Sequence, residues 1–137
     1  MTIKRIRIAL FVCYIVFILW MTIFSRHPTG QHKAEMRLMW SYREMFAGNS
    51  NWKQYVWQNI ENILFFIPFG FMFPLMKCRI ALVSGLLVSI IVESIQYIGC
   101  LGLCELDDVL CNGLGAMIGC IILNCVKIVF KNRDSIK

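Results

Sequence analysis

The stretch IALVSGLLVSIIVESIQYIGCLGL, residues 80–103, carries a single charged side chain, Glu93, and decides the fold class. An apolar run of this length is long enough to cross the hydrocarbon core of a bilayer as an α-helix. The helix is the expected form because every backbone polar group in lipid must be satisfied within its own segment. Residues 80–100 are therefore predicted to form a transmembrane helix.

Three further apolar segments flank this helix and lead to a four-helix prediction. We expect spanning helices over about residues 8–24, 56–76, 80–100 and 109–130, within one all-α membrane domain covering residues 1–137. The composition agrees, because 58% of the residues are hydrophobic and only 16% are charged. Soluble domains usually have about a quarter of their residues charged. The bilayer is thus the first partner that the sequence implies.

The basic residues predict the orientation of the helices. They concentrate at the N-terminus, in the link after the second helix and at the C-terminus: Lys4, Arg5, Arg7, Lys77, Arg79, Lys127, Lys131, Arg133 and Lys137. Cytoplasmic segments are enriched in Lys and Arg, so both termini are predicted inside, with the acidic link 104–108 and the loop 25–55 outside. That loop also carries five basic residues, but they alternate with acids, and the other regions decide. The net charge of +6 is then explained by basic residues in the cytoplasmic segments, and we expect no nucleic-acid partner.

Seven cysteines are scattered through the apolar runs. An odd, scattered set does not form a disulfide framework, and buried cysteine behaves as a small apolar residue. Cys100 and Cys104 flank the acidic outer link, where a disulfide is conceivable, and their redox state stays open. The sequence predicts no cofactor and no metal site.

Polar and small residues share one face on each of the last two helices. With about 100° between successive residues, the two stripes consist of Gly85, Ser89, Glu93 and Gln96, and of Asp108, Asn112, Gly115 and Gly119. Small residues let helix backbones approach closely. We therefore expect the stripes to face each other, with Gly85, Ser89, Gly115 and Gly119 packing the helices together.

The polar ends of these stripes predict a pocket that opens to the outside. Asn62, at the outer end of the second helix, is expected to join Glu93, Gln96, Asp108 and Asn112 there. Gln96 and Asn112 alone would be explained as hydrogen bonds between helices. Glu93 favours a functional site, because a carboxylate within the membrane is costly and marks function by default.

The ordered motifs resemble those of the VanZ-like family over about residues 8–130. They are Asn62-Ile-Leu-Phe-Phe-Ile-Pro-Phe-Gly70, Glu93-x-x-Gln96 and Asp108-Val-x-x-Asn112-x-x-Gly115-x-x-x-Gly119. The resemblance implies a multi-pass protein of the bacterial cytoplasmic membrane, with a role in glycopeptide (teicoplanin-type) antibiotic tolerance or cell-envelope homeostasis. It also implies that Arg37, in the first loop, belongs to the site. Gly102 stands where many relatives carry an arginine.

Two other functional classes remain open. An enzyme acting on a lipid or lipid-linked cell-wall precursor could use Glu93 and Asp108 as acid and base, or hold a hard cation between them. No predicted helix contains a histidine, and no nucleophile motif is present. A structural subunit would use the small-residue stripes to bind another membrane protein. The sequence leaves open whether the ligand is a precursor or a glycopeptide, and whether the protein is catalytic.

Overall fold

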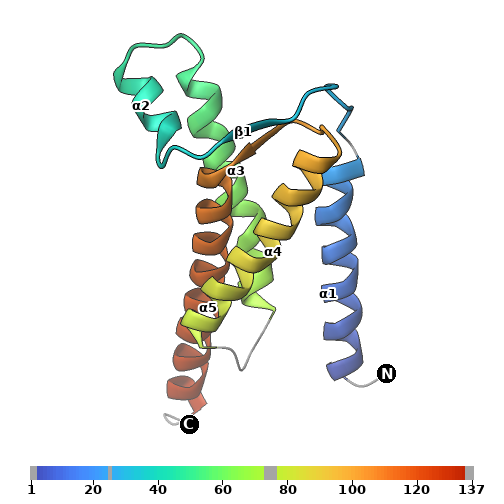
Figure 1. Ribbon diagram of the computed structural model, residues 1–137. Coiled ribbons are helices and arrows are strands. Elements are labelled where there is room, and N and C mark those ends of the chain that lie inside the picture. Colours follow the sequence, from blue (N-terminus) through green and yellow to red (C-terminus); the bar gives the residue numbers. More distant parts are fainter. Residues whose placement is uncertain (1–2, 25, 73–76, 135–137) are drawn as a thin grey trace.

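The computed structural model describes residues 3–24, 26–72 and 77–134 (Figure 1). Four long helices dominate it: α1 (Ile3–Leu19), extended by a π-helical turn (Trp20–Phe24), α3 (Trp52–Phe71), α4 (Cys78–Ile98) and α5 (Leu106–Asp134). The connection between α1 and α3 contains β1 (Lys33–Glu35) and the short helix α2 (Trp40–Phe46), and β2 (Leu103–Glu105) joins α4 to α5. The prediction of a mostly helical chain is confirmed.

The helix boundaries follow the hydropathy pattern with local differences. The helix predicted over 56–76 begins earlier, at Trp52, and continues through Pro68 to Phe71; its predicted end at 73–76 lies outside the described residues. Within residues 3–24, 26–72 and 77–134, two segments are long and apolar enough to cross a membrane, Cys78–Ile98 and Leu106–Asn132, while Ile8–Phe24 is a shorter apolar helix. The loop 25–55, which is predicted to lie outside, contains β1 and α2, and these two elements cover one end of the bundle.

Glycines set the distance between α3 and α5. A Cβ atom added at Gly119 would overlap the backbone carbonyl of Ile67, and one added at Gly115 would overlap that of Ile63. From the other helix, a Cβ at Gly70 would overlap the backbone of Ala116. Such close approach is possible only where side chains are absent. We call Gly70, Gly115, Ala116 and Gly119 the glycine seam.

The prediction that the two small-residue stripes face each other is wrong for Gly115 and Gly119, which pack against α3. The two stripes do meet at their polar part, where Asn112 Nδ2 donates to the Ser89 hydroxyl at 2.7 Å. A Cβ at Gly85 would come within 2.7 Å of the Ala116 Cβ and 3.2 Å of the Asn112 carbonyl oxygen. The reason is that α5 packs on both α3 and α4. Gly115 and Gly119 face α3, whereas Gly113 faces α4, where an added Cβ would come within 2.6 Å of the Leu86 side chain.

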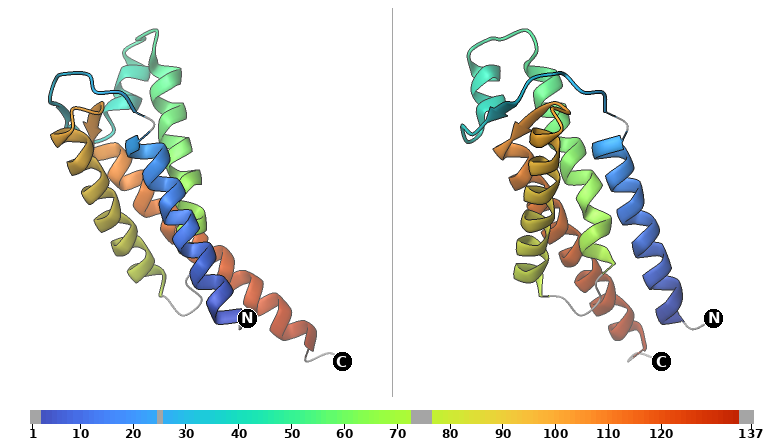
Figure 2. Two further views of the ribbon diagram at one scale, coloured as in Figure 1. Left: turned by 90° about the vertical axis from the view of Figure 1, so that its right-hand side faces the viewer. Right: turned by 45° about the vertical axis from the view of Figure 1, so that its right-hand side comes forward.

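Helix α1 joins the bundle through aromatic contacts with α3 (Figure 2). The ring centroids of Phe11 and Phe69 are 5.9 Å apart, and those of Phe17 and Phe65 are 6.5 Å apart. The Tyr14 hydroxyl donates a hydrogen bond to the backbone carbonyl of Phe65. These contacts extend the core around Phe66, Phe69 and Ala116, so the first helix is packed against the others at its middle.

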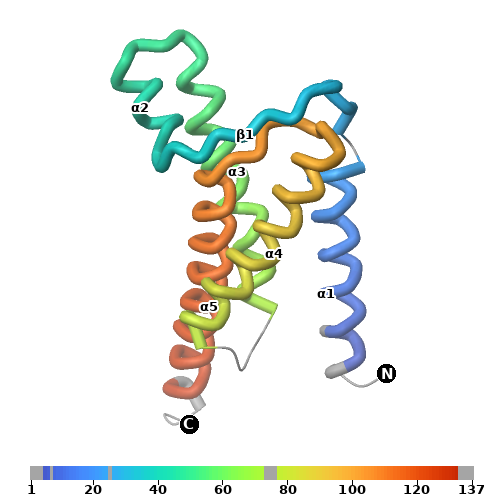
Figure 3. Tube along the Cα trace, viewed as in Figure 1, coloured from blue at the N-terminus to red at the C-terminus, as the bar shows by residue number. Residues whose placement is uncertain are grey.

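The end of the bundle where α4 finishes and α5 begins is covered by the connecting segments (Figure 3). Strand β1 pairs in parallel with β2, with Lys33 opposite Leu103 and Glu35 opposite Glu105. Helix α2 lies beside the first part of α3. We call this the cap end, and it contains the polar residues that the sequence singled out.

Candidate functional site

Four carboxylates are buried at the cap end, and we call them the carboxylate cluster. Glu93 comes from α4, Glu105 from β2, and Asp107 and Asp108 from the first turn of α5. None has more than 6% of its surface exposed. The sequence assigned Glu93 and Asp108 to a site but not Glu105 and Asp107. Glu105 and Asp107 are buried because the segment 39–41 covers them. This segment has no hydrophobic periodicity in the sequence, so the contact could not be predicted.

Glu93 and Asp108 are held by partners from other elements. The Glu93 Oε2 atom accepts a hydrogen bond of 3.0 Å from the backbone amide of Glu105, which ties α4 to the start of α5. The Gln58 Nε2 group of α3 donates to Asp108 Oδ2 at 3.3 Å and to Glu105 Oε1 at 3.4 Å. The cluster therefore joins α3, α4 and α5 at one level of the bundle.

Helix α2 closes the cluster from above. The indole Nε1 of Trp40 donates to Glu105 Oε2 at 2.9 Å. The Met39 backbone amide and the Ser41 hydroxyl donate to the two oxygens of Asp107, at 2.6 and 2.9 Å. The Asn59 Nδ2 group of α3 in turn donates to the Ser41 hydroxyl at 2.9 Å. These bonds give α2 its position and shield the carboxylates from solvent.

A second polar layer lies deeper, about one helical turn from the carboxylates. Asn112, four residues after Asp108, donates from Nδ2 to the Ser89 hydroxyl at 2.7 Å. Five buried polar atoms have no hydrogen-bond partner among the described residues: Asn59 Oδ1, Asn62 Nδ2, Gln96 Oε1, Asp108 Oδ1 and Asn112 Oδ1. Buried polar atoms are normally hydrogen-bonded, so these atoms have capacity for a further polar partner.

Arg37 lies away from the cluster. Its side chain is 62% exposed and forms an ion pair with Glu35, with 2.7 Å between Nη2 and Oε2. Its hydrogen bonds hold the pKa of the Glu35 carboxyl at about 2. The pairing is local, between residues two apart at the end of β1, so Arg37 is already occupied by Glu35 and is not brought to Glu93 or Asp108.

A different arginine acts on the carboxylates. The Nη1 atom of Arg26 lies 2.8 Å from the position that a Cβ of Gly102 would occupy. Its positive charge interacts with both Glu93 and Asp108. Arg26 follows the first apolar run directly. Glu93 and Asp108 are far from Arg26 in the sequence, and no sequence pattern links them, so the sequence analysis did not predict that Arg26 belongs to the site.

Glu105 of the cluster and the neighbouring Cys104 both have raised pKa values. Burial, followed by the negative charges of Asp108 and Asp107, raises the pKa of Glu105 to about 7, although hydrogen bonds from Trp40 and Gln58 act in the opposite direction. Burial and the charge of Glu93 raise the pKa of the neighbouring Cys104 thiol to about 11. Cys104 is therefore a protonated thiol near neutral pH, and both it and Cys100 are free.

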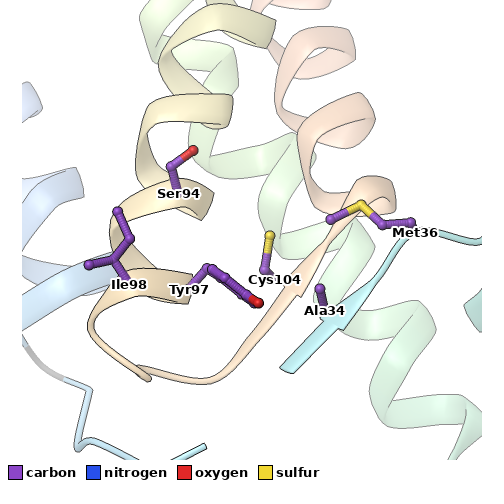
Figure 4. A pocket seen from close by; sticks show the side chains of 6 residues that line it. All are labelled: Ala34, Met36, Ser94, Tyr97, Ile98 and Cys104. Carbon is purple, nitrogen blue, oxygen red and sulfur yellow. The ribbon is translucent and has the colours of Figure 1, made fainter. Parts of the chain in front are cut away.

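A surface pocket of about 440 Å³ opens beside the cluster (Figure 4). It lies between the end of α4 and the two strands, and its lining residues are Ala34, Met36, Ser94, Tyr97, Ile98 and Cys104. The Cys104 thiol donates a hydrogen bond to Glu93, so one wall of this largely apolar pocket contacts the cluster. Among the described residues, no three His, Cys, Asp or Glu side chains are arranged to hold a metal ion.

Among the described residues, two helices are long and apolar enough to span a bilayer, and many large apolar side chains are exposed; together with the family match below, these features indicate a helical membrane protein. The family model described as VanZ/LLP1 matches residues 11–129, and the chain belongs to this family. No curated protein and no solved structure is significantly similar to it.

Proposed function

We propose that the protein is a multi-pass protein of the bacterial cytoplasmic membrane, with α1, α3, α4 and α5 all spanning. The apolar surfaces of α4 and α5 support this proposal. Helix α3 packs along α5, and α1 contacts α3, so α1 and α3 run beside the two apolar helices (Figure 2). With the basic termini in the cytoplasm, the cap end faces outward. A reporter that works only in the cytoplasm should be active when it is fused after Asn132, and a reporter that works only outside the membrane should be inactive there. Activity of the second reporter would exclude this topology.

We further propose that the carboxylate cluster acts in tolerance to teicoplanin-type glycopeptides or in envelope homeostasis. The observation that carries this proposal is the burial of Glu93 and Asp108 in a network closed by α2. Buried carboxylates are costly and a well-packed apolar core is commonly at least as stable. Their retention therefore favours a functional role. In the proposed orientation the cluster lies at the membrane face where cell-wall precursors are exposed, so the candidate ligands are a lipid-linked precursor or the glycopeptide.

A second candidate is an enzyme that acts on a lipid or lipid-linked cell-wall precursor. Glu105 favours it, because a carboxyl with a pKa of about 7 is suited to general acid–base work near neutral pH. The apolar pocket beside Cys104 offers room for part of a lipid chain. A third role, as a structural subunit for another membrane protein, depends on the glycine seam instead of the carboxylates.

The decisive experiment compares variants of equal shape and different charge. Cells producing the Glu93→Gln, Asp108→Asn double variant should lose the protein's effect on glycopeptide susceptibility while membrane levels stay normal. The matched control is Glu61→Gln, because Glu61 is an exposed carboxylate of α3 that accepts from Trp57 Nε1 at 2.6 Å. Lipid-linked precursor profiles of the same cells separate the two functional candidates, since only the enzyme should change them. Full retention of the phenotype by the double variant would leave only the structural role.

A further inference from the structure

The segment that follows α1 is fixed to α4 at two points. The Gln96 Nε2 group donates to the Thr22 carbonyl at 2.8 Å. Seven residues later, the backbone amide and the hydroxyl of Thr29 both donate to the Cys100 carbonyl, at 2.7 and 2.9 Å. Arg26 lies midway between these anchors, and its backbone amide bonds to the Ile23 carbonyl at 3.4 Å. Its position over the cap end is therefore set by contacts on both sides.

Gly102 provides the space that the Arg26 side chain occupies. Its φ of +140° lies in a region that side-chain-bearing residues rarely adopt. A Cβ there would come within 2.8 Å of the Arg26 Nη1 atom. The missing side chain thus leaves room for the guanidinium.

The four buried carboxylates at the cap end require a positive charge or protons to offset their mutual repulsion. The charge of Glu93 of α4 acts on Asp108 of α5, and Glu105 of β2 and Asp107 of α5 add two more buried carboxylates at the same end. Carboxylates buried together are strongly destabilising unless a cation or a proton neutralises them. The Arg26 charge acts on two of the four, whereas Arg37 is engaged by Glu35.

We propose that Arg26 is the counter-ion of the carboxylate cluster and that Gly102 is the notch that admits its guanidinium. Among the described residues, the direct ion pair is that of Arg37 with Glu35, so Arg26 acts on Glu93 and Asp108 through space. In a site with little water such an attraction is stronger than at a surface. Arg26 is a positioning residue, whose positive charge is held beside the cluster by the hydrogen bonds at Thr22 and Thr29.

This proposal predicts a pH-dependent cost of removing Arg26. At about pH 8 Glu105, with its pKa of about 7, is ionised, and Arg26→Gln should lower the melting temperature of the purified protein by about 4 °C. At about pH 5 Glu105 is protonated, the negative charge of the cluster is smaller, and the loss should shrink to less than about half. Arg26→Lys, which keeps the charge, should restore most of the stability at the higher pH. Arg37→Gln, an exposed arginine from the same loop, is the matched control and should show no such dependence.

A double-mutant cycle tests the role of Gly102. Gly102→Ala is costly by itself because of its backbone angle, but that strain does not depend on Arg26. If the notch admits the guanidinium, the alanine should cost less in the Arg26→Gln background than in the wild type, and the difference should be present at pH 8 and smaller at pH 5. Additive effects at both pH values, or an Arg26→Gln loss that is equal at both, would overturn the proposal. The readout is stability, so its failure is distinct from failure of the proposed function.

Discussion

The two ends of the α3–α5 pair are held together by opposite means. At the glycine seam, Gly115 and Gly119 bring the two backbones into contact, and no side chain separates them. At the cap end the same helices are joined by long polar side chains, with Gln58 bridging to Glu105 and Asp108. The seam depends on shape alone. The cluster depends on charge and hydrogen bonding, and it alone should respond to pH.

The difference also separates what maintains the fold from what is available for function. The seam has no polar side chains for a ligand to recognise, and it has room only for residues as small as glycine and alanine. The cluster contains ionisable groups and buried atoms with unused hydrogen-bonding capacity, such as Asp108 Oδ1 and Asn112 Oδ1. Large side chains introduced at the seam should therefore lower the amount of folded protein, whereas variants in the cluster should change the pH dependence of stability or the function of the protein.

The largest effect is expected at the seam. Gly119→Leu places a side chain where the Ile67 carbonyl already lies, and should lower the free energy of unfolding by about 3 kcal/mol or more through overpacking. The protein should be lost from detergent extracts in a fluorescence-detected size-exclusion assay. The control, Met117→Leu, conserves volume on a half-buried position of the same helix and should behave as wild type. Equal recovery of both variants would show that the close approach of α3 and α5 does not hold the fold.

A smaller effect is expected where α2 covers the cluster. Trp40→Phe keeps the buried ring but removes the hydrogen bond to Glu105, and should cost about 1–2 kcal/mol because the carboxylate loses a buried donor. Trp57→Phe removes an equivalent bond, to Glu61, from a residue that is 58% exposed, and solvent can replace that donor. The melting temperatures of the two variants should therefore differ. If they are lowered equally, α2 does not shield the carboxylates.

The contrast between the two ends explains how much the sequence could predict. The helices follow from their apolar runs, and the positions of Glu93, Asp108 and Asn112 along these runs put them at one end of the bundle. Periodicity could not tell which neighbour each face meets, so Gly115 and Gly119 were assigned to the wrong partner. Arg26, Trp40 and Gln58 reach the cluster from other segments of the chain. Only tertiary structure brings these segments together, so no local pattern identifies them.

A third prediction concerns pH and distinguishes the cluster from the seam directly. The pKa of Glu105 is about 7 in the folded protein against an ordinary 4.5, so the folded state binds more protons between these values. Stability contributed by this group is then fully present below about pH 4.5 and is lost as the pH rises to about 7. Glu105→Gln should flatten that decline in melting curves recorded across this range. Gly119→Ala, a seam variant, should lower stability by the same amount at every pH. A decline unchanged in Glu105→Gln would show that this carboxyl has an ordinary pKa in the folded protein.

The smallest effect is expected for Arg37→Gln, and it completes the comparison because it tests an ion pair that belongs to neither end. Arg37 and Glu35 lie in solvent at the edge of β1, where water and salt screen their attraction and holding both side chains in one geometry has an entropic cost. Their short contact of 2.7 Å therefore does not imply a large stabilisation. The melting temperature should stay within the error of the measurement at low and at high salt, and the glycopeptide phenotype should be retained. A loss of phenotype without a loss of stability would bring Arg37 back as a residue that contacts the ligand, as the family resemblance implied. It would also mean that the site extends from the buried carboxylates to the outer face of β1.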